Sequence, residues 1–201
     1  GTLRSVDAMG AYGGPVGTNM DSGAGAVRYR GALMSAALMK LLGVQPLLGR
    51  GFSVADDAAG APRVVVLTQT VWQHAYHADP HIVGRSVRVN GEWVTVVGVL
   101  PTSFNFPGGT QVWLPLHVGI GEHQYVGLVG RLAPSVQLSQ ARAELDTWAA
   151  RLQRALPTAM HSMPIVVGPM AAGFVPTDML SWVWLMFGAA VLVLLLACIN
   201  V

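Results

Sequence analysis

Residues 63–116 read RVVVLTQTVWQHAYHADPHIVGRSVRVNGEWVTVVGVLPTSFNFPGGTQVWLPL, and this stretch decides the fold. It opens with an apolar, β-branched run at residues 64–67, which predicts a buried strand. A short amphipathic helix follows and ends at Asp79-Pro80, because proline lacks the N–H that a helix needs. Asn90-Gly91 then separates two strands. Both residues tolerate positive φ, so the sequence predicts a β-hairpin with a type I′ turn.

The glycine-rich N-terminal stretch, residues 1–26, carries few large apolar side chains. Its glycines and Pro15 interrupt any hydrophobic period, so we expect loop and irregular structure, with a short helix near residues 6–11. Glycines at this density can also cradle phosphate. The Gly-Lys-Ser/Thr sequence of a phosphate-binding loop is absent, however, which favours the loop interpretation.

Two strand-helix-strand units are predicted, one on each side of the hairpin. In the first, a strand at residues 27–34 leads into a helix at residues 36–42, which Gly43 is placed to cap. In the second, a strand at residues 125–132 precedes a helix at residues 139–156, whose apolar residues recur at helical spacing.

A returning strand at residues 165–167 would complete the second unit. The hairpin belongs to a β-rich insert at about residues 84–120. The sequence therefore predicts an α+β fold in which the two strand-helix-strand units form one lobe and the insert forms a second, β-rich lobe.

Composition narrows the function classes. The 201 residues suffice for one sizeable domain or two small ones, and only 11% of them are charged. The net charge is +2 and the arginines are scattered, so no basic stripe predicts nucleic-acid binding. Cys198 is the single cysteine, which excludes an internal disulfide and Cys-x-x-Cys chemistry. Its position in an apolar run predicts a small buried hydrophobic residue.

The C-terminal stretch has the character of a membrane segment. No charged residue follows Asp178, and residues 191–197 are continuously aliphatic. About 20 apolar residues span a bilayer, so we expect a transmembrane helix at residues 181–201, with Trp182 and Trp184 at the interface. A buried core helix is disfavoured because aliphatic residues occupy every face. The chain ends without a polar flank, so we expect this helix to be truncated.

The charges next to this segment indicate its sidedness. No Lys or Arg lies between Arg154 and the apolar run, so this flank lacks the positive charge typical of the cytoplasmic side. We therefore expect residues 1–180 to form a domain outside the cytoplasm. No secretory signal begins the chain, so export would depend on an upstream segment.

His74, His77 and His81 lie near Asp79, and imidazoles with a carboxylate can hold zinc. Pro80 breaks the helix before His81, so three ligands on this short run would not converge. Solvent-facing histidines are therefore favoured.

Asp56 and Asp57 could act as paired catalytic carboxylates, but adjacent side chains rarely aim at one point. A solvated loop is expected instead, with Ser53 and Asp56 capping a helical turn. The Gly-x-Ser-x-Gly elbow and the Walker A sequence are also absent. We therefore assign no catalytic, cofactor-binding or metal-binding residue, and expect neither enzyme activity nor a cofactor.

Short motifs follow one another in a set order along the chain. Within residues 64–116 these are the buried strand, a Val-Trp helix, Asp-Pro, Val-Gly-Arg, the Asn-Gly hairpin, VGVLP, F-x-FP and VWLPL. YRGALMSAALMKLLGVQPLLGRG at residues 29–51 precedes them, and VGRL at residues 129–132 and LLLACINV at residues 194–201 follow. Together they resemble the MacB-like periplasmic core domain of FtsX-type ABC transporter permeases.

The resemblance implies a mechanical part of a transporter that relays ATP-driven conformational change to export of a substrate across the envelope. It implies the cell inner membrane as location, with the folded domain on the periplasmic side and a membrane helix before it. The implied partners are an ABC ATP-binding subunit or domain, on another chain or in missing sequence, and a second permease copy or half. Some family members also use a periplasmic adaptor and an outer-membrane channel.

The alternative is a membrane-anchored extracytoplasmic binding or enzymatic domain. A deep pocket with convergent polar groups would favour it.

Overall fold

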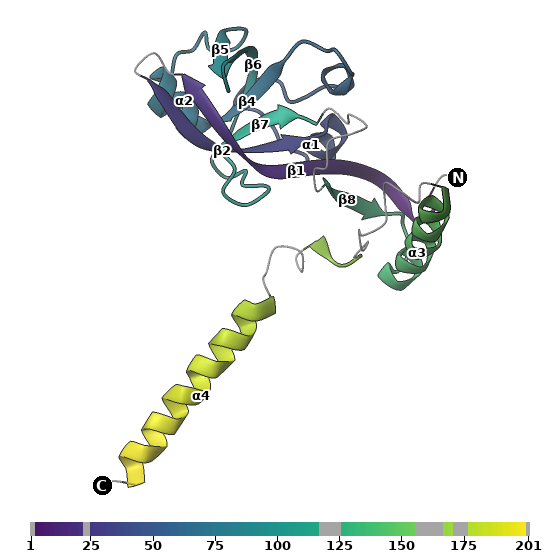
Figure 1. Cartoon of the computed structure of the whole chain (residues 1–201), viewed down its shortest axis with the longest axis vertical. Coiled ribbons are helices and arrows are strands. Elements are labelled where there is room, and N and C mark those ends of the chain that lie inside the picture. Colours follow the sequence, from purple (N-terminus) through teal and green to yellow (C-terminus); the bar gives the residue numbers. More distant parts are fainter. Residues whose placement is uncertain (1–2, 22–24, 117–125, 156–166, 171–176, 200–201) are drawn as a thin grey trace. The chain divides into compact units, whose positions relative to one another are not determined.

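A computed structural model of the chain describes residues 3–21, 25–116, 126–155, 167–170 and 177–199 (Figure 1). The chain divides into two compact units, Gly1–Ser135 and Val136–Val201, which are described separately. The first unit contains β1 (Val6–Asp21), β2 (Ala26–Met34), α1 (Ala36–Leu41), β3 (Leu48–Gly49), the 3-10 helix η1 (Val54–Asp57), β4 (Val64–Thr68), α2 (Gln69–Tyr76), β5 (Ser86–Val89), β6 (Glu92–Leu100), β7 (Val112–Pro115) and β8 (Val126–Leu132). The second unit contains α3 (Leu138–Ala155) and α4 (Thr177–Ile199).

The strands of the described residues form one sheet that closes on itself. The pairing order is β2-β7-β4-β6-β5-β1, and β1 pairs again with β2, so these six strands make a ring. The pairs β2–β7 and β4–β6 are parallel, whereas the other pairs in the ring are antiparallel. β8 pairs with β1 outside the ring, and β3 pairs with β6. A closed ring leaves few exposed strand edges.

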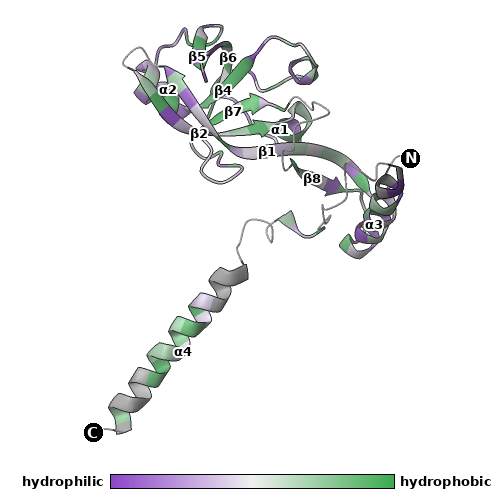
Figure 2. Ribbon diagram, in the orientation of Figure 1, coloured by the Kyte–Doolittle hydropathy of each residue, from purple (hydrophilic) through white to green (hydrophobic). Residues whose placement is uncertain are grey.

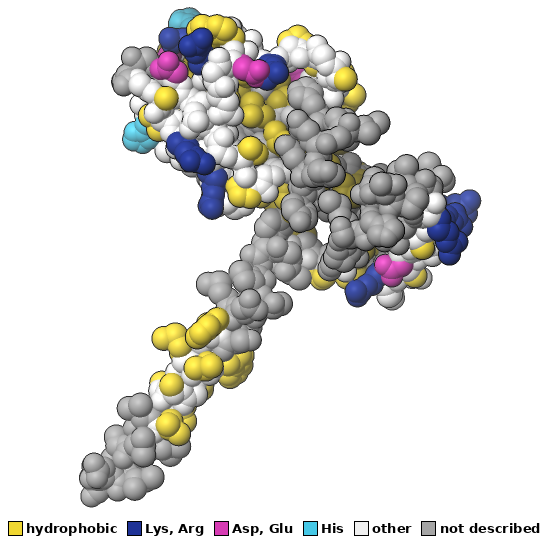
Figure 3. All heavy atoms as spheres, viewed as in Figure 1, with side chains coloured by type: hydrophobic (Ala, Val, Ile, Leu, Met, Phe, Trp, Pro, Cys, Tyr) yellow, Lys and Arg dark blue, Asp and Glu magenta, His cyan; other side chains and the backbone are white. Residues whose placement is uncertain are grey.

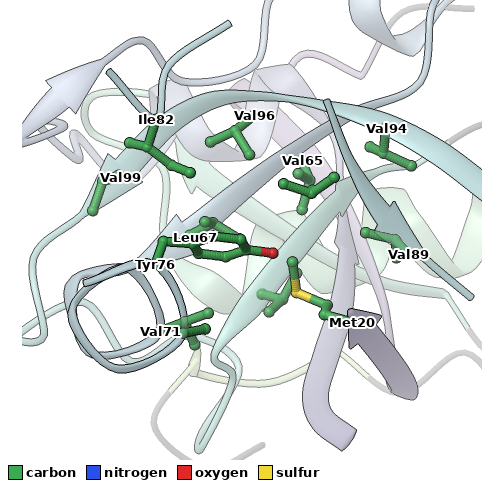
Figure 4. Close-up of a cluster of buried hydrophobic side chains, with 13 residues drawn as sticks. Met20, Val65, Leu67, Val71, Tyr76, Ile82, Val89, Val94, Val96 and Val99 are labelled. Carbon is green, nitrogen blue, oxygen red and sulfur yellow. The ribbon is translucent and has the colours of Figure 1, made fainter. Parts of the chain in front are cut away.

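One hydrophobic cluster fills the ring, and Figure 4 shows part of it. Every strand of the ring contributes at least one residue, and α2 adds Val71, Ala75 and Tyr76. The buried members from the strands are Met20, Val65, Leu67, Val87, Val89, Val94, Val96, Val99 and Val112, with Tyr29 packed against them. The side chains of alternate strand residues therefore meet in the middle of the ring.

A second cluster covers the opposite face of β4 and its neighbours. It joins Val64 and Val66 to Trp113, and α1 packs into it through Leu38 and Met39. Because β4 is buried on both faces, its sequence is a continuous apolar run and does not alternate. The predicted buried strand is confirmed.

The predicted hairpin is also confirmed. Asn90 and Gly91 have φ of 52° and 86°, and Val89 pairs with Glu92 across the turn. The separate β-rich lobe predicted at about residues 84–120 is corrected, because β5 pairs with β1, β6 with β4, and β7 with β2 and β4. Most valines of the hairpin belong to the cluster inside the ring, where they pack with residues of the other strands.

The prediction for the N-terminal stretch is wrong. Residues 6–21 form neither a loop nor a helix but the 16-residue strand β1, which pairs with β2, β5 and β8. Gly10 of this strand lets α1 pack closely against it, because a Cβ on Gly10 would collide with the backbone of Leu38. Pairing with strands distant in sequence thus outweighs the low intrinsic strand preference of glycine.

Other elements lie where they are predicted. Ser35 is the N-cap of α1: its hydroxyl accepts a 3.2 Å hydrogen bond from the Leu38 N–H. Gly43 follows the helix with φ of 67°. β8 and α3 match the predicted second strand and helix within two residues at each end. The predicted returning strand at residues 165–167 lies mostly outside the described residues.

A helix is present at the predicted C-terminal place, and its side chains at residues 182–192 are exposed. Figure 2 shows the described part of α4 as mostly hydrophobic. Within the described residues, no helix combines the length and the apolar character needed to cross a membrane. Cys198 is exposed on α4, contrary to the buried position predicted for it.

Candidate functional site

The three histidines face solvent, as predicted. His74 lies in the last turn of α2, His77 follows the helix with φ of 52°, and both side chains are exposed, as is His81. The Asp79 carboxylate accepts a 2.8 Å hydrogen bond from the His81 N–H and forms a 3.2 Å ion pair with Arg85. Across the described residues, no three His, Cys, Asp or Glu side chains are grouped to hold a metal ion.

The solvated loop predicted for Asp56 is wrong. Its carboxylate is only 8% exposed and binds Arg50 with both oxygens, at 2.5 and 3.1 Å. The Ser53 N–H and hydroxyl each donate a 2.7 Å hydrogen bond to the same carboxylate. The hydrogen bond from Arg50, with those from Ser53, lowers the pKa of Asp56 to about 2.

Asp57 binds elsewhere. One of its carboxylate oxygens accepts a 2.9 Å hydrogen bond from the N–H of Ala36, the first residue of α1. The two neighbouring carboxylates therefore stabilise different elements and do not share a reaction centre. Asp56 holds the Arg50 segment, whereas Asp57 connects η1 to α1.

A shallow pocket of about 190 Å³ opens where β4, α2 and the β6–β7 loop meet. Its lining is neutral and consists mainly of hydroxyl and amide side chains: Thr68, Thr70, Thr102, Phe104, Asn105, Gly109, Thr110 and Gln111. None of these residues is predicted as a site from the sequence. The polar Thr, Asn and Gln between VGVLP and VWLPL were the available signal, but only the fold brings them next to α2.

The loop that forms one wall of the pocket is held by its own hydrogen bonds. Asn105 Oδ1 accepts a 2.5 Å bond from the Gly109 N–H, and the Thr110 hydroxyl donates a 2.6 Å bond to the Pro107 carbonyl. Trp113 Nε1 donates a 2.8 Å bond to the Phe106 carbonyl from beneath. The wall is therefore formed before any ligand arrives.

Gln111 joins the pocket to two strands. Its N–H donates to the Arg30 carbonyl at 2.8 Å, and its carbonyl accepts from the Thr68 N–H at 2.9 Å. Its side-chain Oε1 accepts a 3.2 Å bond from the Arg30 N–H. Three bonds thus hold this residue between β2 and β4.

The outer face of the hairpin carries an exposed aromatic residue beside arginines. Trp93 is 66% exposed, and the Arg88 guanidinium lies 5.4 Å from its ring centroid. Arg63 and Glu92 form an ion pair next to them. Figure 3 shows the basic side chains as separate groups with acidic side chains beside some of them. The side of the molecule in view therefore lacks the continuous basic field of a polyanion-binding surface.

Comparisons with known proteins agree with the fold. The family model of the MacB-like periplasmic core domain matches residues 2–148. No curated protein matches the chain.

Solved structures share the fold at low sequence identity. The extracellular domain of the noncanonic ABC-type transporter YknZ from Gram-positive bacteria is 17% identical with a TM-score of 0.58, over 78% of this chain and 79% of that chain. The periplasmic region of MacB from Actinobacillus actinomycetemcomitans is 14% identical with a TM-score of 0.59, over 80% and 78%. A domain of a putative permease protein from Porphyromonas gingivalis is 16% identical with a TM-score of 0.57, over 84% and 81%.

Proposed function

Because the chain belongs to the MacB-like periplasmic core domain family, we propose that it is the extracytoplasmic domain of an ABC transporter permease and relays ATP-driven conformational change to the export of a substrate. The observation that carries the proposal is the family match over residues 2–148. The proposed location is the inner membrane, with this domain on its outer side.

The packing of the first unit supports a mechanical role. β4 is buried on both faces, between the cluster inside the ring and the cluster beside α1. Close-packed interiors deform little, so a displacement applied at one strand of the ring moves the other strands with it. Such a unit transmits movement better than a loop-rich domain would.

The energy source in this proposal is an ATP-binding subunit or domain outside this sequence, acting on two permease copies or halves. The chain contains no Walker A sequence, so the purified protein should show no melting shift with magnesium-ATP. A saturable shift would contradict this part of the proposal.

We propose further that α4 anchors the domain in the bilayer. Exposed apolar side chains at residues 182–192 support this, because such a surface is costly in water. Cys198 is the single cysteine, so it provides a test in native membranes. A membrane-impermeant maleimide should label it only after detergent is added.

The control for this test places the cysteine on the folded domain. Val54 is 83% exposed, so Val54→Cys in a Cys198→Ser chain should react with the same reagent without detergent. Rapid labelling of Cys198 in intact membranes from both sides would contradict membrane insertion.

We propose that the segment from Pro169 to Asp178 transmits movement between the domain and α4. Residues 171–176 of this segment lie outside the described part of the chain. Its prolines restrict the backbone, and a Gly-Ser insertion after Gly173 would make it a flexible coil. In the full transporter we expect normal assembly and partner ATP hydrolysis with loss of export.

The same insertion after Gly60 is the matched control, because Gly60 lies in an exposed loop with open space around it. Export should survive there. Wild-type export with the insertion after Gly173 would contradict the relay through this segment. The alternative of a binding domain depends on the shallow pocket beside α2.

A further inference from the structure

We propose that the pocket lined by Thr68, Asn105 and Gln111 binds a carboxylate group. This inference concerns a site on the first unit and does not depend on the transport role. The supporting observation is that backbone N–H groups already donate hydrogen bonds to the side-chain oxygens of these three residues.

In both amides of the pocket the side-chain oxygen already accepts a hydrogen bond from the protein, so the NH₂ group is the end that we propose meets a ligand. The oxygen of Asn105 is taken by the Gly109 N–H and that of Gln111 by the Arg30 N–H, at 2.5 and 3.2 Å. A backbone N–H can only donate, so the amide atom that it contacts must be the side-chain oxygen and not the NH₂ group. The NH₂ groups of Asn105 and Gln111 are what remain for a ligand.

Thr68 adds a third donor. Its hydroxyl oxygen accepts a 3.2 Å bond from the Val71 N–H, and the hydroxyl hydrogen remains available to an outside acceptor. The pocket is therefore rich in donors. A ligand with several acceptor oxygens matches these three donors.

The charge at the rim selects an anion among such ligands. No residue that lines the pocket is acidic. The Arg30 guanidinium lies against Gly109, since its Nη1 is 2.6 Å from where a Cβ on that glycine would be. Arg30 is exposed, so a carboxylate in the pocket can reach it without a buried, unpaired charge. The amides and the guanidinium would then share the two oxygens of the carboxylate.

The size of the pocket sets the expected affinity. A cavity of 190 Å³ holds one small group and not a drug-sized molecule. Acetate has few atoms to make contacts and the site is open, so acetate should bind weakly, with a Kd of roughly a millimolar or above. A peptide that carries the same carboxylate can bind more tightly through additional contacts.

The test is a titration of the full, ¹⁵N-labelled chain in zwitterionic detergent, followed by NMR. The probes are sodium acetate, acetamide as its neutral analogue, and an acetylated hexapeptide containing one glutamate, all at equal ionic strength. Acetate should shift the side-chain NH₂ signals of Asn105 and Gln111 saturably, and acetamide should not. Equal shifts with acetamide, or no saturation with acetate, would overturn the proposal.

Variants test whether the positive charge of Arg30 contributes to acetate binding. Arg30→Gln should weaken acetate binding about tenfold, whereas Arg30→Lys should retain most of it. Lys40→Gln removes another exposed positive charge, on α1, and should leave binding unchanged. An equal loss in the Lys40 variant would reduce the effect to net charge and contradict the site. If the hexapeptide binds more tightly than acetate, the carboxylate belongs to a peptide chain; equal affinity assigns it to a small solute.

Discussion

The β5–β6 hairpin and β1 both depend on glycine, but their glycines meet opposite requirements. In the hairpin, Gly91 has φ of 86°, and a Cβ on it would have no atom within 4 Å. In β1, Gly10 has no positive φ but faces the Leu38 backbone so closely that a Cβ cannot fit. Glycine is required in the hairpin by the positive φ of that residue. In β1 it is required by the close approach of Leu38 of α1, which lies 28 positions further along the chain. Local rules therefore predict the first and miss the second.

The largest expected effect is in β1. Gly10→Ala should destabilise the protein by about 3 kcal/mol or more, because either β1 or α1 must move to admit the methyl group. Urea unfolding of the full chain measures the change.

Gly13→Ala is the matched control in the same strand. Its added Cβ would lie 3.5 Å from the Leu33 Cβ, an ordinary contact, so stability should change by less than about 0.5 kcal/mol. Equal effects at Gly10 and Gly13 would mean that strand preference, and not close approach, sets the cost in β1.

The next effect concerns Asp56, a local capping residue that also has an ion-pair partner. The folded-state pKa is about 2, against an ordinary 3.8, so the stabilisation is complete above about pH 4 and is lost as pH falls through 2. Arg50 is half exposed, which reduces the benefit to about 1–2 kcal/mol at pH 7. Asp56→Asn should lose that amount, and the difference should vanish near pH 2.

Asp7→Asn removes an exposed carboxylate of β1 and serves as the control. The measurement is urea unfolding of both variants at steps between pH 7 and pH 2. A pH-independent difference between Asp56→Asn and the wild type would show that the ion pair contributes nothing and that shape alone matters.

A smaller effect is expected in the hairpin. Gly91→Ala should cost about 1 kcal/mol, since the new side chain meets no atoms and only the left-handed backbone conformation is disfavoured. Gly108→Ala, in open space and without a positive φ, should be close to neutral. A cost at Gly91 as large as that at Gly10 would remove the distinction between the two regions.

The smallest effect lies inside the ring. The Tyr76 hydroxyl is buried with no hydrogen-bond partner among the described residues. Figure 4 shows its ring extending from α2 into the cluster. Tyr76→Phe should therefore be neutral or stabilise the protein by up to about 1 kcal/mol.

The stabilities of the wild type and the Tyr76→Phe variant should also differ at alkaline pH. Burial raises the pKa of Tyr76 to about 12, so the contribution of this residue is complete below pH 10 and is lost as pH rises toward 12. The phenylalanine variant should lack that loss, which thermal unfolding between pH 8 and pH 11 can measure. A clear destabilisation of the variant at pH 7 would mean that the hydroxyl is bonded.

The candidate pocket was less predictable than the strands around it. Thr68 and Gln111 are 43 positions apart, and neither stands in a motif with a known chemical role. Their contact follows from the antiparallel pairing of β4 and β7, which places Val66 opposite Trp113 and Leu67 opposite Val112. Neither segment alone contains a sequence pattern that predicts its pairing with a distant strand.

The sequence by itself determined the elements whose cause lies within a few residues: the buried run of β4, the Asn90-Gly91 turn, the cap of α1 and the order of motifs that marks the family. Backbone angle preferences and short-range patterning suffice for these. Only the tertiary structure decided that residues 6–21 form a strand, that the hairpin closes a ring and does not stand apart, and that Asp56 is buried. Each of these depends on which distant surface is available to pack or pair with, and the free energy of that contact exceeds the local preference it overrides.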